Sequence, residues 1–361
     1  MLSFVIFILI LSILIIVHEF GHFLVAKRNG VKVERFSIGF GPPLLRIKSK
    51  GAEFLIGLIP LGGYVKLAGD NISEYQGYPF EFLSKSVGVR AKIVFSGPLF
   101  NYFMAFIVFW VVTILGFPYL DTVVGKVLDD FPAKKAGLKE GDKILEVNGR
   151  KVNHWRQMAE EIRESKDEVI LKVKRDSKII YFTLPLEKKE IEDKFGKKKK
   201  IPVIGIVAGD KIKIVRYNLF KGFFKSIQSV TFITFVIVKG IFFIIFGVLP
   251  FKEAVTGPLG IYYVTSEATK IGMVAVLHLI AVLNISLAVV NLLPLPLLDG
   301  GHLFIFLIEK IRRKRLSEKA EEWWLRLGFL IISFLILFVF YNDIVKFGNK
   351  IWKKESLSQQ K

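Results

Sequence analysis

The sequence predicts a polytopic α-helical membrane protein with about four spanning helices, β-hairpins beside the membrane and one inserted α+β domain. Of its 361 residues, 52% are hydrophobic and 34 are Phe, which is too apolar for an ordinary soluble protein. Stretches of about 20 apolar residues, the length that crosses a hydrocarbon core of about 30 Å, recur along the chain. Between them lies a polar, Gly-punctuated segment. The apolar stretches are 2–25, 91–117, 274–293 and 325–341.

The first predicted element, residues 1–26, is a spanning helix that carries His18, Glu19 and His22. No basic segment precedes it and no cleavage site of small residues follows, so we expect a retained helix. On a helix the two histidines share a face about 5–6 Å apart and can bind one zinc ion, with Glu19 in reach of a metal-bound water. Ionisable groups inside a span cost a few kcal/mol each and indicate function. The structural alternative is a His and a Glu hydrogen-bonded to neighbouring helices.

Residues 27–90 are predicted to form short strands and hairpins on the cytoplasmic side, including a membrane-re-entrant loop. The patterns "VKVERFSIGF" and "EFLIGLIPLGGYVKLAG" alternate and are punctuated by Gly and Pro. These segments are more apolar than exposed strands usually are. We therefore expect some of them to enter the bilayer against protein, because lipid does not tolerate open sheet edges.

The second predicted span, residues 91–118, leads into a polar domain at residues 121–209. A helix, "HWRQMAEEIRES", and the strands "EVILKVKRD" and "KIIYFTLPL" follow the turn-rich string "GLKEGDKILEVNG". That string resembles PDZ domains of bacterial membrane proteases. PDZ domains bind extended chain ends by adding them as a strand to a sheet edge, so a peptide or chain-end ligand is expected here. A plain spacer domain is the alternative, and the four lysines at 197–200 are expected to lie in a solvated loop.

The rest of the chain is predicted to return to the membrane. Lys239 and two glycines interrupt the apolar run 227–248, which suits an interfacial or re-entrant helical segment. A span with the motif "NLLPLPLLDGG", a last span and a polar tail follow. These four regions are residues 220–270, 272–313, 323–345 and 346–361.

A hydrolytic zinc site needs a third protein ligand besides His18 and His22. Asp299 is the strongest candidate, because it follows a Pro-interrupted break where unwound backbone lets a side chain turn inward. His278 lies near the start of its span, on the wrong side for such a site, whereas position alone does not exclude His302. Two neutral imidazoles and one carboxylate leave Zn²⁺ at +1, and a bound hydroxide cancels that charge, which favours a low-dielectric setting.

Four features together resemble the site-2 protease family, and in particular its bacterial regulator-of-sigma-E proteases, here with a single PDZ domain. They are HEFGH in a first span, "SGPLFN" in a second, the PDZ insert and "NLLPLPLLDGG" in a late span, and they cover nearly the whole chain. The resemblance implies one Zn²⁺ per chain held by His18, His22 and Asp299, with Glu19 as catalytic base. Gly97 and Asn101 match the family's second-span motif. Many members carry two PDZ domains, and Ser286 stands where a second Asn is often found.

A transmembrane substrate must unwind before it can be hydrolysed, and each exposed backbone group then costs several kcal/mol in lipid. An edge strand can pair with that backbone, and the hairpin "GLIPLGGYVKLAG" is our candidate, similar to the family's membrane-re-entrant β-loop. Its glycines would allow close approach. A plain structural hairpin is the alternative. The predicted substrate-binding residues, from the hairpin and the two family motifs, are Gly62, Gly63, Tyr64, Val65, Asn101, Asn291, Pro294 and Pro296.

Charge and geometry predict the topology. His18 lies about 25 Å along a helix that rises 1.5 Å per residue, and Asp299 comes about 25 residues into its own span, so both spans must run in the same direction. Basic residues follow both His18 and Asp299 along the chain, which places the ends of the two spans nearest these residues in the cytoplasm. The N-terminus and the PDZ domain then lie on the periplasmic or external side of a bacterial inner membrane, and 227–248 cannot cross it once.

These observations favour an intramembrane zinc endopeptidase that cuts single-span membrane proteins. By resemblance, candidate substrates are anti-sigma factors and remnant signal peptides. The chain has a net charge of +20 but no recognisable nucleic-acid-binding module, so the positive charge suits contact with the lipid bilayer. The absence of Cys excludes disulfides and thiolate metal sites. The alternative is a non-catalytic metal-binding scaffold or sensor that recruits partners through its PDZ domain, although a scaffold has no use for Glu19.

Overall fold

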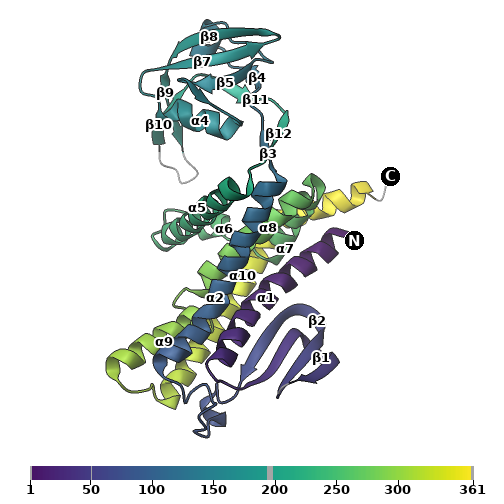
Figure 1. The fold of residues 1–361 in the computed structure, drawn as a ribbon, viewed down its shortest axis with the longest axis vertical. Helices are drawn as coiled ribbons and strands as arrows, with labels where there is room; N and C mark the ends of the chain where they lie inside the picture. The colour runs from purple at the N-terminus through teal and green to yellow at the C-terminus, as the bar shows by residue number, and fades with distance from the viewer. Residues whose placement is uncertain (1, 50, 193–197, 359–361) are drawn as a thin grey trace. The chain divides into compact units, whose positions relative to one another are not determined.

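The computed structural model describes residues 2–49, 51–192 and 198–358 (Figure 1). The chain divides into two compact units, one formed by Met1–Val112 with Lys221–Lys361 and the other by Thr113–Phe220. The first unit is mainly helical. Its elements are α1 (Leu2–Arg28), β1 (Val33–Ser49), β2 (Ala52–Leu67), η1 (Ile72–Glu74), α2 (Val87–Leu115), α5 (Leu219–Ile245), α6 (Phe251–Ala254), α7 (Pro258–Ile271), α8 (Met273–Asn291), α9 (Asp299–Arg312) and α10 (Glu318–Ser358).

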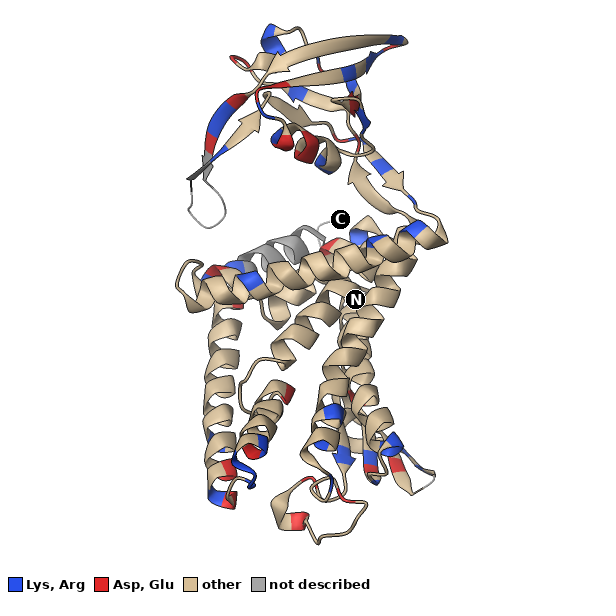
Figure 2. Cartoon of the chain, turned by 60° about the vertical axis from the view of Figure 1, so that its left-hand side comes forward, with Lys and Arg blue, Asp and Glu red and all other residues tan. Residues whose placement is uncertain are grey.

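Within the described residues, five helices are long and apolar enough to cross a membrane: α1, α2, α5, α8 and α10. The sequence predicted four such spans and an interfacial segment at α5. In Figure 2, α5 is turned across the direction of α1 and α2. One face of α5, with Ile233 and Ile237, packs on a cluster from α2 and α8, whereas Phe232 and Phe235 are exposed.

Strands β1 and β2 form one curled sheet because they pair twice. Residues 33–38 pair with 63–67, and residues 45–49 pair with 52–56 near the turn. Residues 35–38 also lie opposite 53–56, so the end of β2 forms an outer edge of the sheet. Ser12 of α1 donates a hydrogen bond of 2.8 Å to Pro60 O, which helps to hold β2 along α1.

The second unit is rich in short strands. Its four-stranded sheet has the order β6-β5-β7-β8, and helix α4 covers a core that includes Ile144, Met158 and Leu171. Its elements are β3 (Phe117–Leu120), β4 (Val124–Val127), α3 (Pro132–Lys135), β5 (Lys143–Val147), β6 (Arg150–Lys151), α4 (Trp155–Glu164), β7 (Glu168–Arg175), β8 (Lys178–Pro185), β9 (Glu187–Glu192), β10 (Lys198–Val203), β11 (Ile206–Ala208) and β12 (Ile212–Val215).

One sequence-based expectation in this unit is wrong. Lys198, Lys199 and Lys200 belong to strand β10 and pair with β9, where a solvated loop was predicted. Lys197 lies outside the described residues. Charged strands of this kind lack the apolar alternation on which strand prediction depends.

A buried ion pair fastens α2 to α9 in the first unit. Arg90 and Glu309 lie 2.6 Å apart, each with a side chain 3% exposed. The Arg90 guanidinium also stacks on Phe306, at 4.7 Å from the ring centroid. Removing one member of such a pair leaves the other charge buried without a partner, which destabilises a protein by about 3–5 kcal/mol. The contact therefore holds the later part of α9 against the start of α2.

Candidate active site

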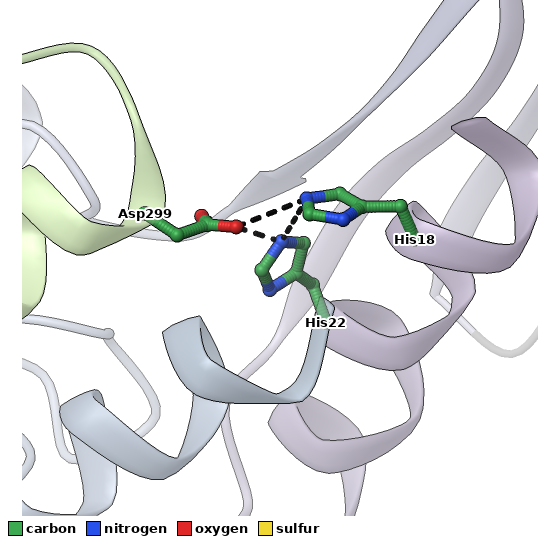
Figure 3. Close-up of side chains that lie close together, drawn as sticks. All are labelled: His18, His22 and Asp299. Atoms are coloured by element: carbon green, nitrogen blue, oxygen red, sulfur yellow. Dashed lines mark hydrogen bonds and ion pairs between the residues drawn. The ribbon is translucent and has the colours of Figure 1, made fainter. Parts of the chain in front are cut away.

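Three potential metal ligands meet where α1 approaches the first turn of α9 (Figure 3). Asp299 Oδ2 lies 3.0 Å from His18 Nε2, and Asp299 Oδ1 lies 3.5 Å from His22 Nε2. The two Nε2 atoms are 3.1 Å apart. Ligands about 2.0–2.1 Å from a tetrahedral zinc ion are separated by roughly 3.3 Å, which matches this triangle.

The donor set also fits a metal chemically. Asp299 Oδ2 is buried and has no hydrogen-bond partner among the described residues. Within that part of the chain, His18, His22 and Asp299 form the only group of three such side chains placed to hold an ion. The other two histidines considered as ligands are not in this group: His278, predicted to lie on the wrong side, packs edge-on against Phe109, and His302 lies one turn beyond Asp299.

A break in the chain delivers Asp299 to this point. Helix α8 ends at Asn291 and α9 begins at Asp299, so residues 272–313, predicted as one span, form two helices. Pro294 and Pro296 have no N–H to continue a helix, and Leu297 adopts a left-handed φ of 69°. The Asp299 carboxylate then stands in the first turn of α9, where a helix favours negative charge.

Glycines allow the backbones to approach at this site. A Cβ on Gly300 or Gly301 would collide with backbone carbonyls of the break, which explains the glycines of the LDGG motif. A Cβ on Gly97 of α2 would collide with the His22 ring, and one on Gly21 of α1 with Ser96 O. Small residues at a helix crossing are the usual means of close packing in membranes. Here they bring α2 against the imidazoles.

Backbone contacts orient His22 and Glu19. His22 Nδ1 lies 2.9 Å from Ile93 O, so an Nδ1–H donating there leaves Nε2 free to face Asp299. The Glu19 carboxylate accepts a hydrogen bond from Val65 N–H at the outer edge of β2. Glu19 is thereby held beside the three-ligand cluster without being part of it.

A cleft of about 500 Å³ opens over these groups. It contains Glu19 and all three candidate ligands, and three of the predicted substrate-binding residues line it: Tyr64, Val65 and Asn291. A second cavity, of about 380 Å³, shares His22, Val65, Asp299 and His302 with the first and continues towards Asp70 and Arg90.

The other predicted substrate-binding residues do not line the cleft. A Cβ on Gly62 would meet the Phe40 ring and one on Gly63 would meet Ser37 O, so packing within the sheet already requires both glycines. Pro294 is exposed, and Pro296 packs against Gly328 of α10. Asn101 is fully buried beside His18.

Sequence reasoning missed several residues that line the cleft. His302 was considered only as a possible zinc ligand; its place in the cleft wall could have been found, since it lies three residues after Asp299 and hence on the same face of α9. The apolar members carry no chemical signature, and only the folded chain brings them here. These residues are Ile15, Leu287, Leu297, Leu298 and His302.

This arrangement defines a class of protein: a metal-dependent hydrolase whose site lies among long apolar helices. Comparison with known proteins agrees, because the model of peptidase family M50 matches residues 6–335. A relative from Clostridium acetobutylicum is 35% identical, with 94% of this chain and 97% of the relative covered. Another from Rickettsia conorii is 35% identical, with 95% and 99% covered. Both carry the name "Putative zinc metalloprotease".

The chain therefore belongs to peptidase family M50, the site-2 protease family, and is a zinc metalloprotease. The predicted family, enzyme class and cofactor are thus confirmed. Among solved structures, the PDZ domain of an SdrC-like protein from Listeria monocytogenes is 30% identical, covering 26% of this chain and 90% of that one, with a TM-score of 0.21.

Proposed function

We propose that this protein is an intramembrane endopeptidase that hydrolyses peptide bonds within or near the membrane segments of single-span proteins. One observation carries the proposal. The cluster of His18, His22 and Asp299 opens into a cleft lined by both polar and apolar side chains, and its two histidines lie within α1, a helix apolar enough to span a membrane. A peptide bond that reaches this cluster has to come from a segment that tolerates lipid.

Each group at the site has a role in the proposed reaction. His18, His22 and Asp299 would hold the zinc ion, which would activate water and polarise the scissile carbonyl. Glu19 takes the proton from the attacking water and passes it to the leaving nitrogen. The bond from Val65 N–H would hold the Glu19 carboxylate in the wall of the cleft.

The outer edge of β2 is the proposed docking strand for the unwound substrate. Residues 63–67 pair with β1 on one side only, and Tyr64 and Val65 line the cleft beside Glu19. Adding the substrate as a further strand satisfies backbone groups that unwinding exposes. The Asn291 side chain, across the cleft at the end of α8, is available to bind a further substrate carbonyl or amide.

The second unit would act as a PDZ domain that binds an extended chain end. A groove of about 460 Å³ lies between α4 and residues 201–206, with Trp155 and Met158 on one wall. Among the described strands β11 pairs only with β4, so its other edge is open to a ligand strand. Remnant signal peptides and anti-sigma factors, the substrates implied by the family resemblance, expose new chain ends after a first cleavage.

Basic residues support the proposed orientation. Lys27 and Arg28 end α1 just beyond the site, and Lys310 and Arg312 lie in the last turn of α9. By the positive-inside rule these ends face the cytoplasm of a bacterial inner membrane. The N-terminus and the second unit would then lie on the external side.

The deciding experiment uses Glu19→Gln in the purified, detergent-solubilised chain with a single-span model substrate. We expect zinc to be retained and cleavage to fall about 10²- to 10⁴-fold, the usual contribution of a general base. Zinc content by atomic absorption and fragment mass by mass spectrometry are the measurements. Full cleavage by the Gln variant would refute the assigned role of Glu19. A wild-type chain that binds zinc but cleaves no substrate would favour the scaffold alternative.

A further inference from the structure

Asn101 lies directly behind His18, on the side away from Asp299. It is a fully buried residue of α2, and its Nδ2 is 3.3 Å from His18 Nδ1. Its Oδ1 is buried and has no hydrogen-bond partner in the described part of the chain. A buried amide oxygen without a partner costs about 1–3 kcal/mol, so its presence here requires a reason.

The chemistry of a metal-binding histidine supplies that reason. His18 Nε2 faces His22 Nε2 and Asp299, so His18 must keep its Nε2 lone pair free and carry its proton on Nδ1. An Nδ1–H needs an acceptor. The two ends of a carboxamide have the same shape, and a half-turn of the Asn101 amide puts Oδ1 where Nδ2 stands. That turn gives both the orphaned oxygen and the ring N–H a partner.

We propose that Asn101 is a positioning residue for the zinc site: its Oδ1 accepts the hydrogen bond from His18 Nδ1–H and so fixes both the tautomer and the plane of the ring. The inference rests on the proposed metal site. Helix α2 then orients both imidazoles, because Ile93 O accepts a hydrogen bond from His22 Nδ1–H in the same way, at 2.9 Å. Asn101 therefore acts through a ligand and does not contact the substrate.

The test compares zinc affinity in Asn101→Leu and Asn284→Leu, using the full detergent-solubilised chain and competition with a zinc chelator. Asn284 is a matched control, since it is also fully buried, its Oδ1 also has no partner, and its Nδ2 bonds to Ile280 O within α8. Loss of the group that hydrogen-bonds to a metal-binding histidine typically weakens metal binding about 10- to 100-fold. We expect that loss for Asn101→Leu and an unchanged affinity for Asn284→Leu.

A conservative variant separates positioning from packing. Asn101→Asp keeps an acceptor for Nδ1–H and should bind zinc at least as tightly as the wild type. Metal-free Asn101→Leu should melt at the same temperature as the metal-free wild type, and added zinc should raise its melting temperature less. If Asn101→Leu does not fold, Asn101→Ala replaces it in the comparison.

The outcomes are distinct. Wild-type zinc affinity in Asn101→Leu, or an equal loss in Asn101→Asp and Asn101→Leu, overturns the positioning role and leaves the metal site standing. Zinc binding that survives His22→Ala in the otherwise wild-type chain overturns the metal site itself.

Discussion

Gly97 has no side chain, and the imidazoles of the HExxH motif occupy the space beside it. A Cβ there would overlap the His22 ring and press on His18, whereas a Cβ on Gly88, in the same helix, would meet nothing within 4 Å. The ligands are thus held by contacts with helix α2 as well as by their own spacing in α1. At the scale of the residue, the geometry of the site depends on the absence of a side chain at position 97.

This contrast gives a prediction with a built-in control. Gly97→Ala should displace a zinc ligand and weaken zinc binding by about 100-fold or more, beyond the usual loss when only a hydrogen-bond partner of a ligand is removed. Gly88→Ala should leave zinc binding and cleavage unchanged. Chelator competition and cleavage of a single-span substrate measure both quantities. Equal behaviour of the two variants would mean that α2 does not pack on the imidazoles as described.

At the scale of the element, the end of β2 has two partners. Its inner side pairs with β1, and Val65 N–H on its outer side bonds to the Glu19 carboxylate. The strand therefore positions the proposed general base and also offers the edge on which a substrate would pair. In its proposed position within the membrane, such a strand edge would be unfavourable without these polar contacts.

Proline at position 65 tests this double role. Edge strands tolerate Pro where the N–H points away from the sheet, so Val65→Pro should fold and bind zinc. It loses a hydrogen bond to a charged group, worth about 1.5–3 kcal/mol, and should cleave roughly 10- to 150-fold more slowly, or slower still if the substrate also pairs there. Val65→Ala keeps the N–H and should retain most activity. Unchanged turnover in Val65→Pro would contradict both roles.

At the scale of the whole molecule, the chain consists of two units with separate cores, and the second has its own acid-sensitive contact. Asp142 is buried in that unit and binds Arg175 through both carboxylate oxygens at 2.7 Å. Burial opposes ionisation of Asp142, but the hydrogen bonds from Arg175 and from Lys139 N–H outweigh it and hold its pKa below the ordinary 3.8.

A lowered carboxyl pKa has a definite consequence for stability. The contribution of Asp142 is fully present above its unfolded pKa of about 4 and is lost as pH falls through the lower folded value. Hydrogen exchange of β5 and β7 in the full chain should therefore accelerate in acid. Asp142→Asn should be less stable at pH 7 and show a flatter acid dependence, whereas Asp176→Asn, in the β7–β8 turn, should follow the wild type. A wild-type acid dependence in Asp142→Asn would exclude this contact as its source.

Much of this protein is determined by local sequence. Helical periodicity alone places His18 and His22 on one face of α1, and the lengths of the apolar runs account for the helices α1, α2, α8 and α10. The Pro-interrupted LDGG segment indicates a break in a late span. These features depend on neighbours a few residues apart, so the sequence displays them directly.

Only the tertiary structure decided the remainder, because it depends on contacts between residues far apart in the chain. It brings Asp299, and not His302, to the two histidines, although position along the chain alone did not exclude His302. It places the buried side chain of Asn101 beside His18, with Nδ2 at 3.3 Å from His18 Nδ1. It also pairs Val65 with Glu19. A contact of this kind between helices and strands leaves no periodic pattern, since it is set by the packing of whole elements.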